Sequence, residues 1–195
     1  MNILLVNPEM ILESYLPISI TSIAGYIQQF GYDPVVYSCQ GKSIEDFEAI
    51  IESQKWDIIG FTSIISHYKN LKLFTKIARH NCHSAKIVIG GPLANVLPDY
   101  LLKNLDADLV ICGEGEFSFL RLLQCLENSE PLINVPGIVF FDDAGNLLKN
   151  QVVNALPLDQ VPILPLEDFN IEPYINHPLG RSVNIQLSRG CPNSC

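Results

Sequence analysis

Short apolar runs alternate with amphipathic segments along the first 130 residues of the chain. The runs are continuous, which is typical of strands that are buried on both faces of a parallel sheet. The amphipathic segments place apolar residues every three or four positions, the period of a helix that packs by one face. The predicted strands cover residues 3–6, 35–37, 58–62, 87–89 and 109–112.

A helix is expected after each strand. These helices fall at about residues 20–30, 43–53, 68–80, 96–105 and 116–126. Gly31 is well placed to end the first, because glycine readily adopts the left-handed conformation found after helix C-termini. Such alternation implies right-handed crossovers and helices on both faces of the sheet. We therefore predict an α/β fold, a Rossmann-like, flavodoxin-type, doubly wound sheet of five parallel strands.

The chain changes character after residue 130. Two apolar runs, 137–141 and 147–149, flank a turn rich in Asp, Asn and Gly and predict a β-hairpin. Five prolines between residues 157 and 178 disfavour a helix and predict a linker that crosses a surface. We predict three parts: residues 1–130, a hairpin and Pro-rich linker over 131–180, and the start of another domain over 181–195.

Composition narrows the class of protein. With 195 residues, 48% of them hydrophobic and 17% charged, the chain can bury a full core. The net charge of −9 argues against a nucleic-acid partner, since such binding uses clustered Lys and Arg. There is no uninterrupted apolar run of about 18 residues and no basic N-terminal region, so neither a membrane span nor a signal peptide is expected. The expected location is the cytoplasm, which suits the scattered single cysteines at 39, 82, 112 and 125.

Ligands of doubly wound sheets bind outside the carboxyl ends of the strands. The corresponding loops here are 7–15, 62–67, 90–93 and 113–116. Three of these loops have small or glycine residues at the strand end, and glycine lets a ligand approach the backbone closely. The sequence therefore predicts a ligand site at this edge of the sheet.

The last two cysteines are the only pair with a recognisable spacing. Cys191 and Cys195 follow Arg189-Gly190 and an alternating apolar stretch, 183–187, that predicts a strand. Thiolates are the usual ligands of iron–sulfur clusters. On spacing alone, a disulfide or a chance pair is favoured over cluster ligation. In its context the pair resembles the first two ligands of the radical SAM motif C-x-x-x-C-x-x-C, whose third ligand would lie three residues after Cys195.

Four further motifs, in order, resemble the cobalamin-binding domain that precedes many radical SAM domains. They are LPISITSIA at 16–24, WDIIGFTS at 56–63, VIGGP at 88–92 and GEGE at 113–116. Each motif is weak alone. Their order, their distances and the cysteine pair behind them make the resemblance specific.

The resemblance implies a set of cobalamin-binding residues at the strand ends. They are Thr62, Ser63, Ile64, Gly90, Gly91, Pro92, Gly113, Glu114, Gly115 and Glu116. The segment 90–92 is also compatible with a simple turn into the next helix, and the two glutamates also suit a helix N-terminus through its dipole. A dinucleotide fingerprint would follow the first strand, so the glycines at 113 and 115 do not indicate one.

The sequence departs from the family pattern in two ways. Cobalamin domains that coordinate cobalt themselves carry Asp-x-His-x-x-Gly after the first strand, but the loop 7–15 contains no histidine. If cobalamin binds, cobalt is therefore expected to have no protein imidazole. His67 is expected to be a solvated residue at a helix start. Ser19 replaces the usual glycine at the start of the first helix, where the corrin would approach the backbone.

The resemblance implies the cobalamin-binding module of a radical SAM enzyme. In the full-length protein, a [4Fe-4S] cluster held by Cys191, Cys195 and a third thiolate would bind S-adenosylmethionine, and cobalamin would carry a methyl group to a substrate carbon radical. The 195-residue piece alone would not be catalytically competent, so its partners would be the radical SAM barrel and a small-molecule substrate.

An alternative function is the same fold without a corrinoid, acting as a docking or regulatory domain of a radical SAM protein. Two other classes fit poorly. A phospho-acceptor receiver needs an acidic cluster at the strand ends, whereas Asp57 begins its strand. A flavin or nucleotide module needs a phosphate loop, which the sequence does not provide.

Overall fold

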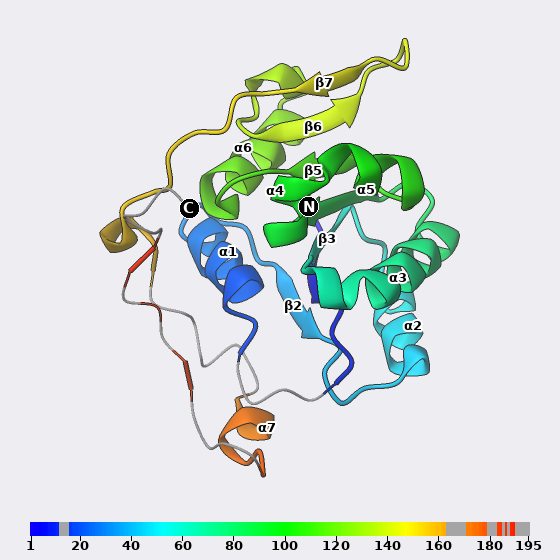
Figure 1. Ribbon diagram of the computed structural model, residues 1–195, viewed down its shortest axis with the longest axis vertical. Helices are drawn as coiled ribbons and strands as arrows, with labels where there is room; N and C mark the ends of the chain where they lie inside the picture. The colour runs from blue at the N-terminus through cyan, green and yellow to red at the C-terminus, as the bar shows by residue number, and fades with distance from the viewer. Residues whose placement is uncertain (12–15, 163–170, 179–182, 185, 187, 190–195) are drawn as a thin grey trace.

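One seven-stranded sheet organises the computed structural model, which describes residues 1–11, 16–162, 171–178, 183, 184, 186, 188 and 189 (Figure 1). The strand order is β2-β1-β3-β4-β5-β6-β7. The strands are β1 (Ile3–Asn7), β2 (Val35–Ser38), β3 (Ile58–Thr62), β4 (Lys86–Gly90), β5 (Leu109–Ile111), β6 (Ile138–Phe141) and β7 (Leu147–Lys149). The helices are α1 (Ile18–Gln28), α2 (Ile44–Glu52), α3 (Tyr68–Asn81), α4 (Pro92–Val96), α5 (Pro98–Asn104), α6 (Gly115–Glu127) and α7 (Glu172–Ile175), with short 3-10 helices η1 (Ile65–His67), η2 (Leu132–Asn134) and η3 (Leu158–Gln160).

The first five strands are parallel, as the apolar runs predict. The chain passes from β1 to β2 on one side and then returns to place β3 on the other side of β1. All five carboxyl ends therefore meet at one edge of the sheet, where such folds bind ligands. The predicted Rossmann-like, doubly wound α/β fold is confirmed.

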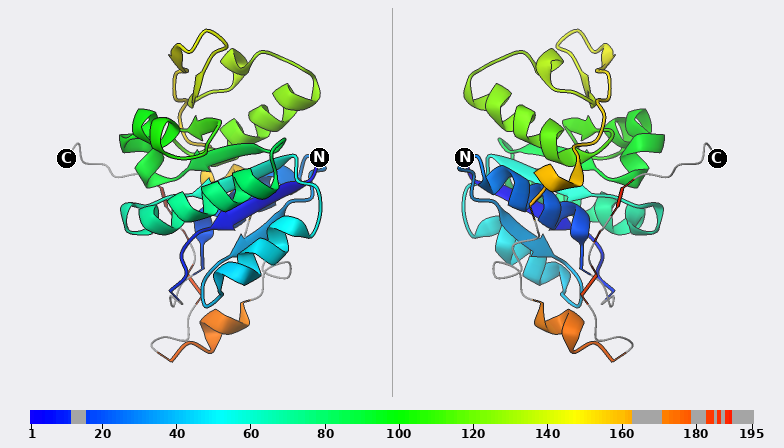
Figure 2. Two further views of the ribbon diagram at one scale, coloured as in Figure 1. Left: turned by 90° about the vertical axis from the view of Figure 1, so that its right-hand side faces the viewer. Right: turned by 90° about the vertical axis from the view of Figure 1, so that its left-hand side faces the viewer.

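Helices cover both faces of the sheet (Figure 2). On one face α1 packs beside α6, and Ile27, Leu122 and Leu123 are fully buried there. On the other face α2 packs beside α3, where the rings of Phe47 and Phe74 are tilted by 43° with their centroids 4.4 Å apart. Burying continuous apolar runs between two helical layers is the main force that holds such a sheet together.

The predicted hairpin forms, but it is part of the sheet. β6 pairs antiparallel with β5, placing Val139 beside Val110, and β7 pairs with β6. Ile138 and Val139 are buried. The hairpin therefore covers the edge of β5, a pairing that the sequence pattern did not predict.

Two helices differ from their predicted extents. The segment predicted as one helix over 96–105 is broken between α4 and α5 at Leu97, whose φ is −132°. The cause is Pro98, because the residue before a proline is pushed out of the helical region. The first helix ends at Gln28, ahead of Gly31 with φ +85°.

The Pro-rich segment carries only short helical turns, η3 and α7, within its described residues. Of the strand predicted over 183–187, residues 185 and 187 lie outside the described part, and the remaining three are in no strand. Cys191 and Cys195 also lie outside it. Within the part of the chain that the structure describes, no helix has the length and apolar character needed to cross a bilayer.

Candidate functional site

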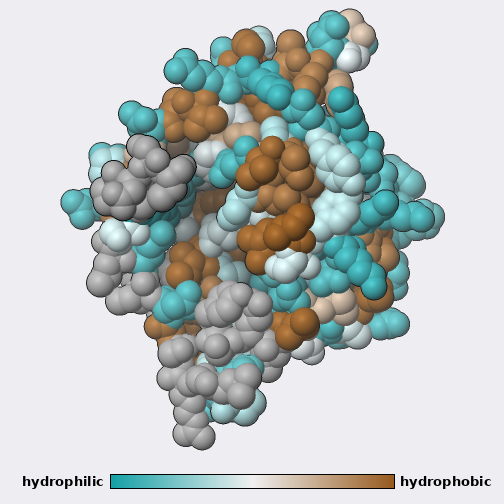
Figure 3. All heavy atoms as spheres, viewed as in Figure 1, coloured by the Kyte–Doolittle hydropathy of each residue, from teal (hydrophilic) through white to brown (hydrophobic). Residues whose placement is uncertain are grey.

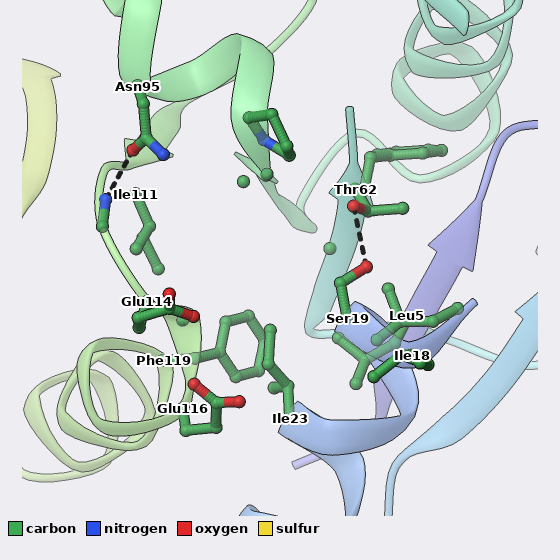
Figure 4. Close-up of a pocket in the computed structure, with 18 of the residues that line it drawn as sticks. Leu5, Ile18, Ser19, Ile23, Thr62, Asn95, Ile111, Glu114, Glu116 and Phe119 are labelled. Atoms are coloured by element: carbon green, nitrogen blue, oxygen red, sulfur yellow. Dashed lines mark hydrogen bonds between the residues drawn. The ribbon is translucent and has the colours of Figure 1, made fainter. Parts of the chain in front are cut away.

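A cavity of about 620 Å³ opens at the carboxyl ends of β3, β4 and β5, between the N-terminal ends of α1 and α6 (Figure 4). Its apolar lining is Leu5, Ile18, Ile20, Ile23, Phe61, Val88, Ile111 and Phe119. Its polar lining is Ser19, Thr62, Asn95, Glu114, Glu116, Asn184, Gln186, Ser188 and Arg189. Small-molecule sites commonly have volumes of about 300–1,000 Å³ and this mixture of an apolar wall with a few polar groups.

Glycines keep part of the cavity wall free of side chains. At Gly60, an added Cβ would lie 3.0 Å from Leu5 Cδ2 and 3.4 Å from Phe119 Cε2. At Gly90 it would meet only the carbonyl oxygen of Ile111, at 3.9 Å, so open space lies where a side chain would stand. A ligand in the cavity can therefore reach the backbone at the end of β4.

Gly91 shapes the turn that follows β4. Its φ is +92°, and a Cβ there would lie 2.7 Å from the backbone nitrogen and oxygen of Ser63. Ser63 Oγ in turn donates a hydrogen bond of 2.6 Å to the carbonyl oxygen of Gly90. The loops after β3 and β4 are thus joined so closely that only glycine fits at position 91.

Hydroxyl and amide groups lie on opposite sides of the cavity mouth (Figure 4). Ser19 Oγ, at the start of α1, is 3.0 Å from Thr62 Oγ1, at the end of β3. On the other side, the backbone N–H of Gly113 donates to Asn95 Oδ1 at 2.6 Å. These groups can hydrogen-bond a polar ligand that enters between them.

Glu116 is the one buried carboxylate of the cavity lining. Its Oε1 accepts hydrogen bonds of 2.6 Å from both Ser22 Oγ and Arg189 Nη2. Burial raises the pKa of Glu116, but the hydrogen bonds from Arg189 and Ser22 outweigh burial and leave the pKa below its usual value. Glu116 is therefore ionised at neutral pH, with its charge balanced by the Arg189 guanidinium.

The structure brings most of the residues implied by the resemblance around this one cavity. Eight of the ten line it: Thr62, Gly90, Gly91, Pro92, Gly113, Glu114, Gly115 and Glu116. Ser63 and Ile64 do not line it. Ser63 is fully buried and acts by holding the Gly90 loop.

Several lining residues were not predicted from the sequence. The sequence places Phe119 in a helix and Ile23 in both a helix and the motif at 16–24, but it marks neither as a binding residue, and nothing in it singles out Asn95. Arg189 was noted only as a neighbour of Cys191, yet it reaches the cavity from far along the chain. No spacing rule joins positions 116 and 189, so this contact needed the structure.

His67 is not the solvated residue that the sequence analysis expects. It is 6% exposed, and its Nε2 lies 2.7 Å from Glu9 Oε2. Glu9 follows β1 and also accepts a hydrogen bond from the backbone N–H of Ile11. Because β1 and β3 are neighbours, their loops bring these two side chains together. Neither lines the cavity.

The described residues hold no grouping of three or more His, Cys, Asp or Glu side chains suited to a metal ion. Cys39, Cys82, Cys112 and Cys125 are free thiols. Burial raises the pKa of the Cys39 thiol to about 12. The iron–sulfur prediction concerns Cys191 and Cys195, which lie outside the described residues.

Exposed apolar side chains accompany the same edge of the sheet. Ile65 follows β3 and Val96 follows β4, and they are 72% and 73% exposed. Figure 3 shows apolar residues gathered near the centre of the face viewed in Figure 1. Isolated exposed apolar residues are ordinary, but apolar residues gathered on one face are typical of a binding surface.

Sequence comparisons find curated proteins that are similar to this chain. The anaerobic magnesium-protoporphyrin IX monomethyl ester cyclase of Synechocystis sp. is 26% identical over 193 residues, covering 94% of this chain and 38% of the cyclase. The cytidylyl-2-hydroxyethylphosphonate methyltransferase of Streptomyces wedmorensis is 24% identical, covering 99% of this chain and 46% of that protein. The chain thus spans less than half the length of either relative.

Solved structures share the fold. The cobalamin-dependent S-adenosylmethionine radical enzyme OxsB, with aqua-cobalamin and S-adenosylmethionine bound, superposes with a TM-score of 0.72 at 21% identity, covering 85% of this chain and 24% of OxsB. The radical S-adenosylmethionine methyltransferase TsrM of Kitasatospora setae, with cobalamin and a [4Fe-4S] cluster bound, gives 0.69 at 15% identity, covering 83% and 31%. The family model of the B12 binding domain matches residues 11–123, so the chain belongs to the B12-binding domain family.

Proposed function

We propose that this chain binds cobalamin, with the nucleotide tail in the cavity and the corrin over the strand ends. The observation that carries the proposal is the cavity itself, which lies at the carboxyl ends of the strands, where open α/β sheets bind ligands, and is open at Gly90. A planar benzimidazole suits the slot between the apolar side chains of Ile23, Phe119 and Ile111.

The polar groups of the cavity suit the rest of the tail. The Ser19 and Thr62 hydroxyls can hydrogen-bond a ribose or phosphate oxygen. An anionic phosphate would be repelled by a free carboxylate, but Arg189 balances the charge of Glu116. The second carboxylate of the lining, Glu114, is 50% exposed, so solvent screens its charge. The exposed side chains of Ile65 and Val96 supply apolar contact for a corrin ring outside the cavity.

Cobalt would have no protein imidazole in this arrangement. Among the residues that the structure describes, no histidine lines the cavity, and the buried His67 is held by Glu9. Cobalamin, when bound, supplies a cobalt centre that can carry a methyl group. The protein contributes a shaped, partly apolar site that orients the cofactor and restricts water.

In the longer protein, Cys191 and Cys195 would provide two thiolates of a [4Fe-4S] cluster that binds S-adenosylmethionine. Residues 1–130, with the hairpin that extends their sheet, would then form the cofactor domain. The Pro-rich linker up to residue 180 would be the connection, and the segment from 181 would start a radical SAM barrel. Support comes from the relatives' names, which include a cyclase and a methyltransferase. Methyl transfer to a small molecule is the activity that we propose.

Reconstitution with hydroxocobalamin tests the binding function. The chain is incubated with excess hydroxocobalamin, separated by gel filtration and examined by visible absorption. We expect corrin absorbance to co-elute at about one equivalent per chain. A folded chain that elutes without corrin absorbance would favour the docking or regulatory module instead.

A further inference from the structure

We propose that Arg189 is a positioning residue that ties the segment leading to Cys191 to the wall of the cobalamin cavity through Glu116. The inference rests on the proposed function for the roles of the cavity and of the cysteine pair. It also predicts that the docked segment and a ligand in the cavity stabilise each other. We call the described residues 183, 184, 186, 188 and 189 the strap.

The arginine is held by side chains from two helices. Its Nη2 lies 2.6 Å from Glu116 Oε1 on α6 and 3.0 Å from Ser22 Oγ on α1. Its Nη1 lies 3.4 Å from Glu114 Oε2, and its Nε donates to Gln186 Oε1 at 3.1 Å. Every nitrogen of the guanidinium therefore has a partner.

Burial makes this contact more than a surface ion pair. The side chains of Arg189 and Glu116 are 10% and 4% exposed, whereas most exposed pairs contribute little to stability. If Arg189 is lost, the Glu116 carboxylate stays buried without its countercharge, which is strongly unfavourable. The docked position of Arg189 is therefore strongly preferred over a released one.

A second contact holds the strap farther from the cysteines. The backbone N–H of Leu16, just before α1, donates to Asn184 Oδ1 at 2.9 Å. Asn184, Gln186, Ser188 and Arg189 all line the cavity. The strap is thus one wall of the cavity, and Cys191 lies only two residues beyond its last anchor.

This geometry explains the buried glutamate in the first turn of α6. The α6 N-terminus alone would favour an acidic side chain there, but it would not require burial. Burial next to Ser22 instead creates a specific acceptor for the guanidinium fork. Because the docked strap forms one wall of the cavity, a ligand bound there should favour docking of the strap. The docked strap should in turn raise the affinity of the cavity for that ligand by the same factor.

Trypsin tests the contact, because it cuts after Arg189 only when that side chain is free. The variant Glu116→Gln keeps the tryptic site but removes the charge that holds it. We expect the cut after Arg189, followed by mass spectrometry, to be about tenfold faster in this variant. The cut after Arg79, inside α3, reports global unfolding and should change less than about twofold.

Glu130→Gln is the matched control, since Glu130 also pairs with an arginine, Arg121, at 2.9 Å but does not line the cavity. In Glu130→Gln, trypsin should cut after Arg189 at the same rate as in the unmodified chain. Equal rates in Glu116→Gln and Glu130→Gln would overturn the proposal. If Glu116→Gln does not fold, hydrogen exchange of the 183–189 peptide in Arg189→Gln decides instead: about tenfold faster exchange supports the contact, and unchanged exchange overturns it.

The link to the cofactor is tested by repeating the digestion with saturating hydroxocobalamin. We expect the cut after Arg189 to slow severalfold in the unmodified chain and to change less in Glu116→Gln. Retained cobalamin with an unchanged cutting rate would overturn the coupling. If the chain retains no cobalamin, the proposed function is contradicted. The digestion of Glu116→Gln and Glu130→Gln without cobalamin still decides the role of Arg189.

Discussion

At the scale of single residues, Gly90 is the position where the cavity depends most on an absent side chain. An added Cβ there would meet only one atom within 4 Å, so a larger side chain can extend into the cavity. We expect Gly90→Leu to keep a cooperative unfolding transition and to lower hydroxocobalamin affinity by at least about tenfold, as judged by equilibrium dialysis. Lys86→Leu, at the exposed start of the same strand, is the control and should bind normally.

The sequence predicted such residues only where a local rule applied. Gly90 and Gly91 were found because glycines at strand ends admit ligands. Arg189 was missed because its contact with Glu116 joins two segments 73 residues apart, and His67 was wrongly expected to be solvated because its partner, Glu9, follows a different strand.

At the scale of elements, two hydrogen bonds between neighbouring residues cap the N-terminus of α2. Ser43 Oγ accepts from the backbone N–H of Asp46 at 3.2 Å, and the Asp46 carboxylate accepts from the backbone N–H of Ser43 at 2.8 Å. We expect Ser43→Ala to lower the free energy of unfolding by about 1 kcal/mol, measured by urea denaturation with Trp56 fluorescence. Ser84→Ala, in an exposed turn, should leave it unchanged.

The same cap gives a pH dependence. Hydrogen bonds from the backbone and side chain of Ser43 lower the pKa of Asp46 in the folded chain. The stabilisation is present above the unfolded aspartate pKa of about 3.9 and is lost as pH falls through the lower folded value. We therefore expect the destabilisation of Asp46→Asn to be present at pH 7 and to shrink below about pH 4, which urea denaturation at several pH values would show; a difference that does not change with pH would contradict it.

At the scale of the whole molecule, the hairpin is a structural part of the sheet. The sequence pattern correctly predicted five parallel strands and a hairpin. It did not predict that the hairpin pairs with β5, because the pairing of two strands leaves no periodic signal in the sequence. Ile138 and Val139 are almost fully buried against the sheet. A chain that ends at residue 136 should therefore lose about 3 kcal/mol or more of stability, whereas one that ends at 162 should retain its hairpin and unfold at higher urea. Equal urea midpoints for the two shortened chains would contradict the view that the hairpin is part of the sheet.

The placement of the nucleotide tail is the central claim, and cobinamide, a corrinoid without that tail, tests it most directly. The measurement is the ratio of the dissociation constants of cobalamin and cobinamide for the unmodified chain. A tail that fills the apolar cavity should make cobalamin bind about 100-fold more tightly, the equivalent of about 2.7 kcal/mol. Equal affinities for the two corrinoids would contradict the placement of the tail in the cavity between α1 and α6.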